Sequence, residues 1–286
     1  MPIRALLLTI LLASPLAAQD SIPVTEARTP RVTAGVTTGT MGFADRRVQQ
    51  GVTAVVRYHF AHSMSVALSP AFARIAFPSS LGGGAVSGLT DLPVELSADH
   101  SFGIPWSPTP GISLGASIPV GNRQAGFGTG GVGATIGAGL GLSPLDAFSL
   151  HAGVGKSLDD YSLSSSLGAS SSTWGDLEMS YQLLEHIEAT AGVNGDVASS
   201  DSLGSSRAVA LSLAMNVHGP YTVTLSGGHG ISGAAARWTL AVGFGTDFAG
   251  IQSLGSSSPI QRFMRSLGGG SHRGSGSTSS GHGRGG

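Results

Sequence analysis

Between residues 31 and 248, the chain is a succession of strand-length segments in which apolar and polar residues alternate. From residue 176 to residue 183, for example, Asp, Glu, Ser and Gln alternate with Leu, Met, Tyr and Leu. Successive side chains of a strand point to opposite faces, so each segment has one polar and one apolar wall. This pattern is typical of transmembrane β-barrels, whose strands of ~10 residues are apolar outside and polar inside.

The gaps between these segments are alternately short and long. The predicted strands are 31–43, 50–60, 64–77, 88–102, 109–120, 129–142, 148–158, 173–184, 187–198, 206–217, 221–230 and 236–248. Outer-membrane barrels have short periplasmic turns, long external loops and an even number of strands. The sequence therefore predicts an all-β fold, a transmembrane antiparallel β-barrel of about twelve strands with both termini in the periplasm. A barrel of ten strands is the competing prediction, if the third or eleventh segment is not a strand.

Two other folds fit parts of the pattern less well. A secreted β-sandwich also alternates, but it packs large apolar residues on its inner face and lacks the rhythm of short and long gaps. Residues 125–145 contain no charged residue, as a transmembrane helix would require, yet glycine recurs throughout this segment. Each interior glycine costs ~1 kcal/mol of helix propensity relative to alanine. The barrel is therefore favoured over both.

The two ends of the chain differ from its centre. Residues 1–19 have the charged start, apolar core and small-residue end of a secretory signal peptide, with cleavage after Ala18 or Gln19. Residues 20–30 form a lead segment, and 31–248 the barrel. Residues 249–286 are a basic tail rich in Gly and Ser, and we expect it to be disordered. Entry of this tail into an acidic lumen as a gate is a second hypothesis.

Export and a barrel predict an outer-membrane location in a Gram-negative-type envelope. The expected partners are outer-membrane lipid, the barrel-assembly machinery and small solutes. A net charge of −1 gives no indication of nucleic acid binding. The chain has no cysteine, which excludes a lipoprotein anchor, disulfides and thiolate ligands.

Charged residues of the inward parity are the candidates for solute or ion selectivity. They are Asp91, Glu95, Asp99, Asp176, Glu178, Glu188, Asp196 and Arg57. An inward position avoids the ~2–4 kcal/mol that an Arg or Lys facing lipid at mid-bilayer would cost. One interpretation is a pore that favours cations or orients solutes. The other is that these charges only hydrate the lumen or pair across it.

Nothing in the sequence indicates an enzyme, a cofactor or a metal site. The histidines are scattered, and none has a partner at metal-ligand spacing. His151 lies near Ser149, but its parity points inward and no acidic neighbour in the sequence supports a catalytic arrangement.

Three details give further expectations. Ile75 and Phe77 leave the parity of the preceding residues, which predicts a β-bulge at Pro70. The sixth strand has glycine at most inward positions, which predicts barrel curvature, with close approach of a solute or plug as alternatives. Aromatic residues near strand ends predict girdles at the membrane surfaces: Tyr58, Phe60, Trp174, Tyr181, Tyr221, Trp238 and Phe248.

The middle of the chain resembles the outer-membrane transporter-like family that is named for the meta-pathway of phenol degradation. The matching segments are Ser87-Gly88-Leu89-Thr90-Asp91-Leu92, Ser113-Leu114-Gly115-Ala116, Ile118-Pro119-Val120-Gly121-Asn122 and Gly126-Phe127-Gly128-Thr129-Gly130. Their order and spacing match over most of 31–248, although Thr90 stands where the family commonly has glycine. The resemblance implies a barrel that passes small aromatic or hydrophobic compounds. The expected function is thus a passive channel or transporter-like protein, and the alternative is a non-conducting surface barrel whose loops bind partners.

Overall fold

The computed structural model describes residues 32–61, 63–102, 104–122, 125, 127–128, 130–145, 147–161, 170–199, 206–232 and 235–246. The strands in these ranges are β1 (Val32–Gly42), β2 (Val48–Ala61), β3 (Met64–Leu68), β4 (Ala71–Ala76), β5 (Ala85–Leu89), β6 (Leu92–Asp99), β7 (Thr109–Ile118), β8 (Val132–Leu145), β9 (Phe148–Tyr161), β10 (Ser170–Leu184), β11 (Ile187–Ser199), β12 (Arg207–His218), β13 (Tyr221–Gly230) and β14 (Trp238–Thr246). A short 3-10 helix, η1 (Ser79–Leu81), follows β4. The predicted signal peptide, lead segment and tail lie outside the described residues. Within those residues, no helix has the length and apolar character needed to cross a membrane.

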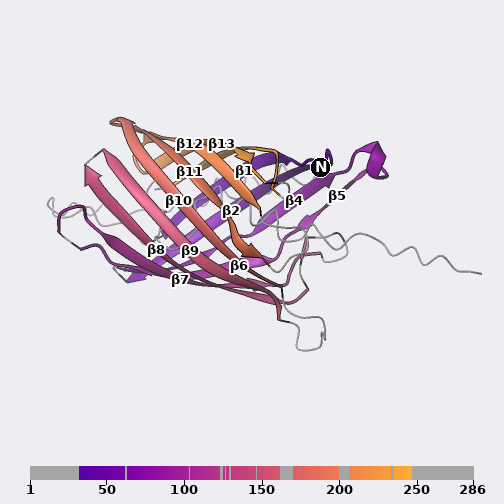
Figure 1. Ribbon diagram of the computed structural model, residues 1–286, viewed down its shortest axis with the longest axis horizontal. Coiled ribbons are helices and arrows are strands. Elements are labelled where there is room, and N and C mark those ends of the chain that lie inside the picture. Colours follow the sequence, from indigo (N-terminus) through magenta and orange to yellow (C-terminus); the bar gives the residue numbers. More distant parts are fainter. Residues whose placement is uncertain are drawn as a thin grey trace, which may run out of the picture. The chain divides into compact units, whose positions relative to one another are not determined.

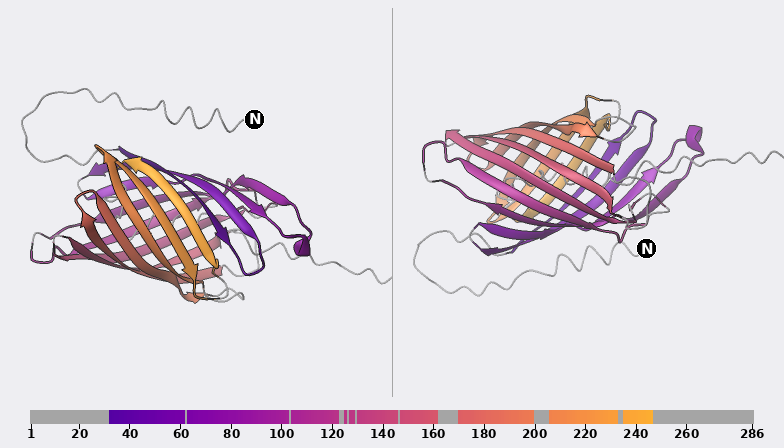
Figure 2. Two further views of the ribbon diagram at one scale, coloured as in Figure 1. Left: turned by 90° about the horizontal axis from the view of Figure 1, so that it is seen from above. Right: turned by 60° about the horizontal axis from the view of Figure 1, so that its bottom comes forward.

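The strands form one antiparallel sheet that closes on itself (Figures 1 and 2). Around the ring the order is β1, β14, β13, β12, β11, β10, β9, β8, β7, β6, β3 and β2, and β2 pairs again with β1. β4 continues β3, because β2 pairs with both in a single register. Beside β4, β5 takes the place of β6 in the sheet, with one extra residue between the two. The wall therefore has twelve strands, which confirms the predicted barrel and excludes ten.

The connections between strands define two ends of the barrel. The loop end carries the connections after β1, β4, β7, β9, β11 and β13, and the β4–β5 connection with η1 extends beyond the rest of the sheet there (Figure 1). The turn end carries the connections after β2, β6, β8, β10 and β12. The predicted long connection 159–172 is shorter than expected, because β9 runs to Tyr161 and β10 begins at Ser170.

The outer surface of the barrel is apolar and the inner surface largely polar. On β10, Leu177, Met179 and Tyr181 are each more than half exposed, whereas the alternate Asp176, Glu178 and Ser180 are buried. On β14, the exposed residues are Trp238, Leu240, Val242 and Phe244, and Thr239 and Ala241 between them are buried. A soluble sandwich would bury the large apolar side chains, so this arrangement is that of a barrel in lipid.

The bulge predicted at Pro70 is not there. Val56 pairs with Leu68 and Thr53 with Ala71, so β2 passes Pro70 without a shift in register. The Ala54 N–H even donates to the Pro70 carbonyl oxygen over 3.0 Å. The extra residue lies in the neighbouring strand, at Thr90–Asp91 between β5 and β6. Proline cannot donate to the ladder, but its carbonyl can still accept, and this is enough to keep the register.

Ile75 faces the lumen without any change of register. It is buried together with Ala71 and Ala73, which have the same parity, while Phe72 and Arg74 are exposed. The sequence places an apolar residue on the inner wall here, near the loop end of β4.

Candidate solute path through the lumen

One wall of the lumen, built by β2, β3 and β6, carries a buried arginine. Arg57 on β2 is 1% exposed, and its Nη2 lies 3.9 Å from Oε1 of Glu95 on β6. The pairing Arg57–Ala67–Glu95 across the three strands explains the contact, because the small Ala67 side chain leaves room between the two charged residues. Closer to the turn end, the Ser65 and Ser97 hydroxyls are 2.8 Å apart. In this wall, the positive charge of Arg57 and the negative charge of Glu95 thus compensate each other within the lumen.

A second wall, built by β9 and β10, carries a histidine between two carboxylates. His151 Nδ1 lies 3.1 Å from Oδ2 of Asp176, and Glu178 is directly opposite His151 in the β9–β10 register. Asp176 and Glu178 are buried, and His151 Nε2 is buried without a hydrogen-bond partner. The contact between Nδ1 and the Asp176 carboxylate holds the imidazole ring against β10, and Nε2 is enclosed by the wall.

The two walls face one another. Five strands separate β2 from β10 in either direction around the ring, so Arg57 and the Asp176 and Glu178 carboxylates arise from opposite sides. A dipolar solute between them would have a preferred orientation.

Inward-facing glycines make room for the large residues of the second wall. A Cβ atom at Gly155 would overlap the Trp174 ring and the Ile136 carbonyl oxygen, and one at Gly153 would lie 2.6 Å from Asp176 Oδ1. Side chains of β10 thus approach the backbone of β9 closely, and the curvature, solute or plug predicted for the sixth strand, which is β8, stays a prediction. Trp174 is 6% exposed, so its prediction as a girdle residue is wrong. Its own parity, shared with Asp176, already pointed inward.

Three of the other predicted lumen carboxylates have local partners. Asp91 lies at the Thr90–Asp91 bulge, where its Oδ1 accepts a hydrogen bond from the Gly121 N–H over 2.9 Å. Asp196 accepts from the Ser206 N–H over 3.2 Å. Both interactions bind segments at the loop end. On β11, Glu188 Oε1 lies 3.5 Å from the Thr190 hydroxyl that donates to it.

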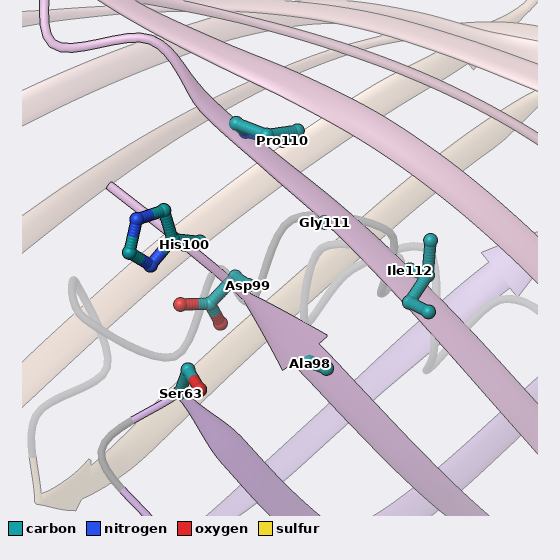
Figure 3. Close-up of a pocket in the computed structure, with 7 residues that line it drawn as sticks. All are labelled: Ser63, Ala98, Asp99, His100, Pro110, Gly111 and Ile112. Atoms are coloured by element: carbon teal, nitrogen blue, oxygen red, sulfur yellow. The ribbon is translucent and has the colours of Figure 1, made fainter. Parts of the chain in front are cut away.

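Asp99 lies at the turn end and lines a small pocket of about 260 Å³ (Figure 3). The other lining residues come from the starts or ends of β3, β6 and β7: Ser63, Ala98, His100, Pro110, Gly111 and Ile112. Arg57 and His59 both lie within electrostatic range of Asp99. The pocket is at the rim and not in the middle of the barrel, so we treat Asp99 as a residue of the turn-end mouth.

At the loop end part of the inner wall is apolar. An apolar cluster of buried side chains lies on β1, β4, β14 and the β7–β8 and β13–β14 connections, and Phe43, Phe77, Val86 and Ala125 pack against it. Its buried members are Met41, Ala73, Ile75, Phe127, Ala236 and Ala241. β4, β2, β1 and β14 are adjacent in the sheet, and on β2 the buried polar Gln49 lies between Ile75 and Met41, so the cluster surrounds one polar side chain.

Phe127 joins this apolar cluster from a connection that is held against β5. The Asn122 N–H donates to the Leu89 carbonyl over 3.3 Å, and Gly121 is bound by Asp91 as described. Gly88 of β5 lies under the Phe127 ring, since a Cβ atom there would be 3.1 Å from Phe127 Cδ2. The β7–β8 connection thus places an aromatic ring over the lumen side of the loop end.

Sequence reasoning missed the His151–Asp176 pair and the apolar cluster. The acidic partner of His151 is not near it in the sequence but on the next strand, and the pairing of Asp176 with Gly153 brings the two together. For the cluster, the departure of Ile75 and Phe77 from the expected parity was a signal. This change of parity reflects an apolar lining of the lumen and not the predicted β-bulge.

Comparison with known proteins identifies the fold. No protein-family profile matches the sequence. No curated protein matches it either. Among solved structures, an outer membrane channel from Pseudomonas putida F1 is similar with a TM-score of 0.60 and 12% identity, over 79% of this chain and 96% of that one. The NanC porin is similar with a TM-score of 0.54 and 10% identity, over 74% of this chain and 98% of that one. The chain therefore has the fold of outer-membrane β-barrels.

Proposed function

We propose that the protein is a passive outer-membrane channel for small, uncharged solutes with an aromatic or other apolar part, and that its loop end faces outward. The apolar cluster carries this proposal. In a barrel whose other buried inward residues are mostly polar, hydrocarbon at one mouth has no role in hydrating a water-filled pore. The resemblance to the transporter-like family supports the same solute class, and no catalytic role is proposed.

The order of apolar and polar regions suits passage in small steps. An apolar surface transferred from water to hydrocarbon gains about 25 cal/mol per Å², so an aromatic solute would bind weakly at the apolar cluster. An ion would lose hydration there without compensation. Beyond the cluster, the walls of Arg57, Glu95, His151 and Asp176 offer hydrogen bonds, so a solute with a single polar group would not be held at the mouth.

The lumen charges have a second role in this proposal. Arg57 on one side and Asp176 and Glu178 on the other would orient a dipolar solute, and the carboxylates Glu95, Asp99 and Glu178 would favour cations over anions. The separation of these residues around the ring supports orientation. Delivery to the membrane by the barrel-assembly machinery belongs to the same proposal.

Uptake of N-phenylnaphthylamine by intact cells tests the solute class. This small aromatic dye fluoresces when it passes the outer membrane, so the initial rate measures permeation. Cells with the protein are expected to take up dye faster than cells without it. Phe127→Asp is expected to return the rate to the level without protein, and Phe127→Leu to keep it, because only the former places a charge at the apolar cluster.

Heat-modified migration on gels would show that equal amounts of each variant are folded. Ile75→Asn, which changes the same cluster from a β-strand, provides a second variant that should also slow uptake. Equal dye uptake with and without the protein would contradict the proposal. So would a Phe127→Asp barrel, shown to be folded, that takes up dye at the rate of the unmodified protein.

A further inference from the structure

The cations of the barrel are distributed unequally between its two ends. The structure describes seven Arg and Lys residues: Arg46, Arg47, Arg57, Arg74, Lys156, Arg207 and Arg237. Arg57 lies in the lumen, and the other six lie in the loop half of the barrel. In the described residues of the turn end, the charged or titratable side chains instead include the carboxylates Asp99, Glu185 and Glu188 and histidines such as His186 and His218.

Three of the loop-half cations are on the lipid-facing side of strands. On β4, Arg74 is exposed and follows the outward Phe72. On β9, Lys156 is exposed and follows the outward Val154. On β12, Arg207 is exposed and precedes the outward Val209. Arg74 and Arg207 therefore stand near the loop-end limits of their apolar stripes, whereas Lys156 is followed toward the loops by Leu158 on β9 and by Ala134 and Val132 on β8.

Their energetic cost shows at which depth they lie. An Arg or Lys on the lipid face costs ~2–4 kcal/mol at mid-bilayer and ~0–1 kcal/mol near the interface. Arg74 and Lys156 belong to none of the ion pairs among the side chains that the structure describes. These side chains are tolerable only at the level of lipid headgroups, to which their long stems can extend.

We propose that Arg74, Lys156 and Arg207 form a cation belt that binds the phosphate groups of glycolipids in the outer leaflet. The three residues lie on strands separated by at least two others around the ring, which suits a layer of many headgroups better than a single ligand. This inference rests on the proposed location and on the loop end facing outward. It does not depend on whether the barrel conducts solutes.

Charge complementarity favours this partner. Phosphorylated glycolipid presents a dense anionic surface. Each Lys or Arg side chain next to such a surface strengthens the binding of the protein to the lipid by roughly fivefold. At the turn end, the exposed outward residues near strand ends include aliphatic residues and the aromatic Tyr58, Phe60 and Tyr181. The two ends of the barrel are thus matched to two different leaflets.

Native mass spectrometry of the full-length barrel in detergent tests the belt. The probes are lipid A and dephosphorylated lipid A, and the readout is the bound fraction at equal lipid concentration. We expect lipid A to bind and the dephosphorylated form to bind far more weakly. Arg74→Gln combined with Lys156→Gln should lower lipid A affinity by about twentyfold, whereas Arg74→Lys should keep it.

Arg47→Gln is the matched control. It removes a cation from the same end, but Arg47 already pairs with Asp45 and lies 5.0 Å above the Phe43 ring centroid. We expect this variant to bind lipid A as the unmodified protein does. Equal binding of both lipid forms, an unchanged affinity in the double variant, or displacement of lipid A by millimolar inorganic phosphate would each overturn the proposal, the last by showing a site for free anions. A barrel that binds lipid A in this way but fails in dye uptake would refute only the proposed channel.

Discussion

The loop end of the lumen and its middle follow the same alternation of side chains but differ in chemistry. At the loop end the buried inward residues include an apolar cluster, with members such as Met41, Ile75 and Phe127, beside the polar Gln49. In the middle they include charged residues, of which Arg57 is as deeply buried as the apolar residues and Glu178, at 8% exposed, slightly less so. Burial inside this barrel therefore does not indicate apolar character. What distinguishes the two regions is whether the residues require partners.

Charged residues of the middle region have partners of opposite charge. Arg57 has Glu95, and His151 has Asp176. Removal of one partner from a buried pair leaves an uncompensated charge and is far more costly than the pair is worth. The apolar cluster at the loop end needs no such pairing. Its Phe127, however, lies in the β7–β8 connection, which the hydrogen bond between Gly121 and Asp91 holds in place. The comparison predicts large stability effects in the middle and smaller effects at the loop end.

The largest effect is expected for Arg57→Ala. This change leaves Glu95 without its cation, and it should lower the free energy of unfolding by about 3 kcal/mol, the low end for a buried pair because Glu95 is partly exposed. Urea unfolding in detergent, followed by gel migration of the folded barrel, measures the loss. Arg57→Lys keeps the charge and should lose less. An unchanged midpoint for Arg57→Ala would show that the charge pair does not contribute to stability.

A somewhat smaller effect is expected for Gly155→Ala. The added methyl group would overlap the Trp174 ring and the Ile136 carbonyl, and overpacking of this kind costs about 2 kcal/mol. Gly227→Ala is the matched control, since the nearest atom to its Cβ would be at an ordinary 3.7 Å. The same urea titration compares the two. Equal stability of both variants would mean that Trp174 has no fixed place against β9.

At the loop end, Asp91→Ala should have a smaller effect on stability. It removes the acceptor of the Gly121 N–H, a charge-assisted hydrogen bond worth about 1.5 kcal/mol. Hydrogen exchange of the amides in 119–122 is the direct readout, and we expect faster exchange there with little change in the β9–β10 hairpin. Protection that stays the same at Gly121 would contradict the assignment of Asp91 to this connection.

The smallest effect is expected for Glu178→Gln. It removes one carboxylate from the wall opposite Arg57 without changing shape, so the folded barrel should persist. In planar bilayers with a salt gradient, the reversal potential should shift toward lower cation preference. An identical reversal potential would assign Glu178 a structural role only, which is the second interpretation of the lumen charges.

The outer shape of the fold could be predicted because alternation is a local property. A residue such as Leu177 reveals its face through its immediate neighbours, and the twelve strands follow from the same rule. The error at Pro70 had a physical cause. Proline was expected to break the ladder, but only its missing N–H matters, and its carbonyl still accepts a hydrogen bond from Ala54.

The candidate site was predictable only in part, because contacts across strands depend on register. Arg57 and Glu95 were both recognised as inward residues, yet their pairing needs the exact alignment of β2, β3 and β6. His151 and Asp176 meet through the alignment of β9 with β10, across a long connection that the sequence does not determine. Phe127 lies in a connection, where no alternation exists to show that its ring is buried.

The most direct measurement is photoaffinity labelling of the barrel in intact outer membranes with a small aromatic diazirine, followed by peptide mass spectrometry. The account predicts label on Met41, Ile75 and Phe127 that excess unlabelled aromatic compound suppresses, because the apolar cluster would be a contact on the solute path. Label on outward residues such as Leu68 and Phe72 should resist this competition, since it arises from probe dissolved in lipid. Label confined to the outward residues and unaffected by competition would contradict the account.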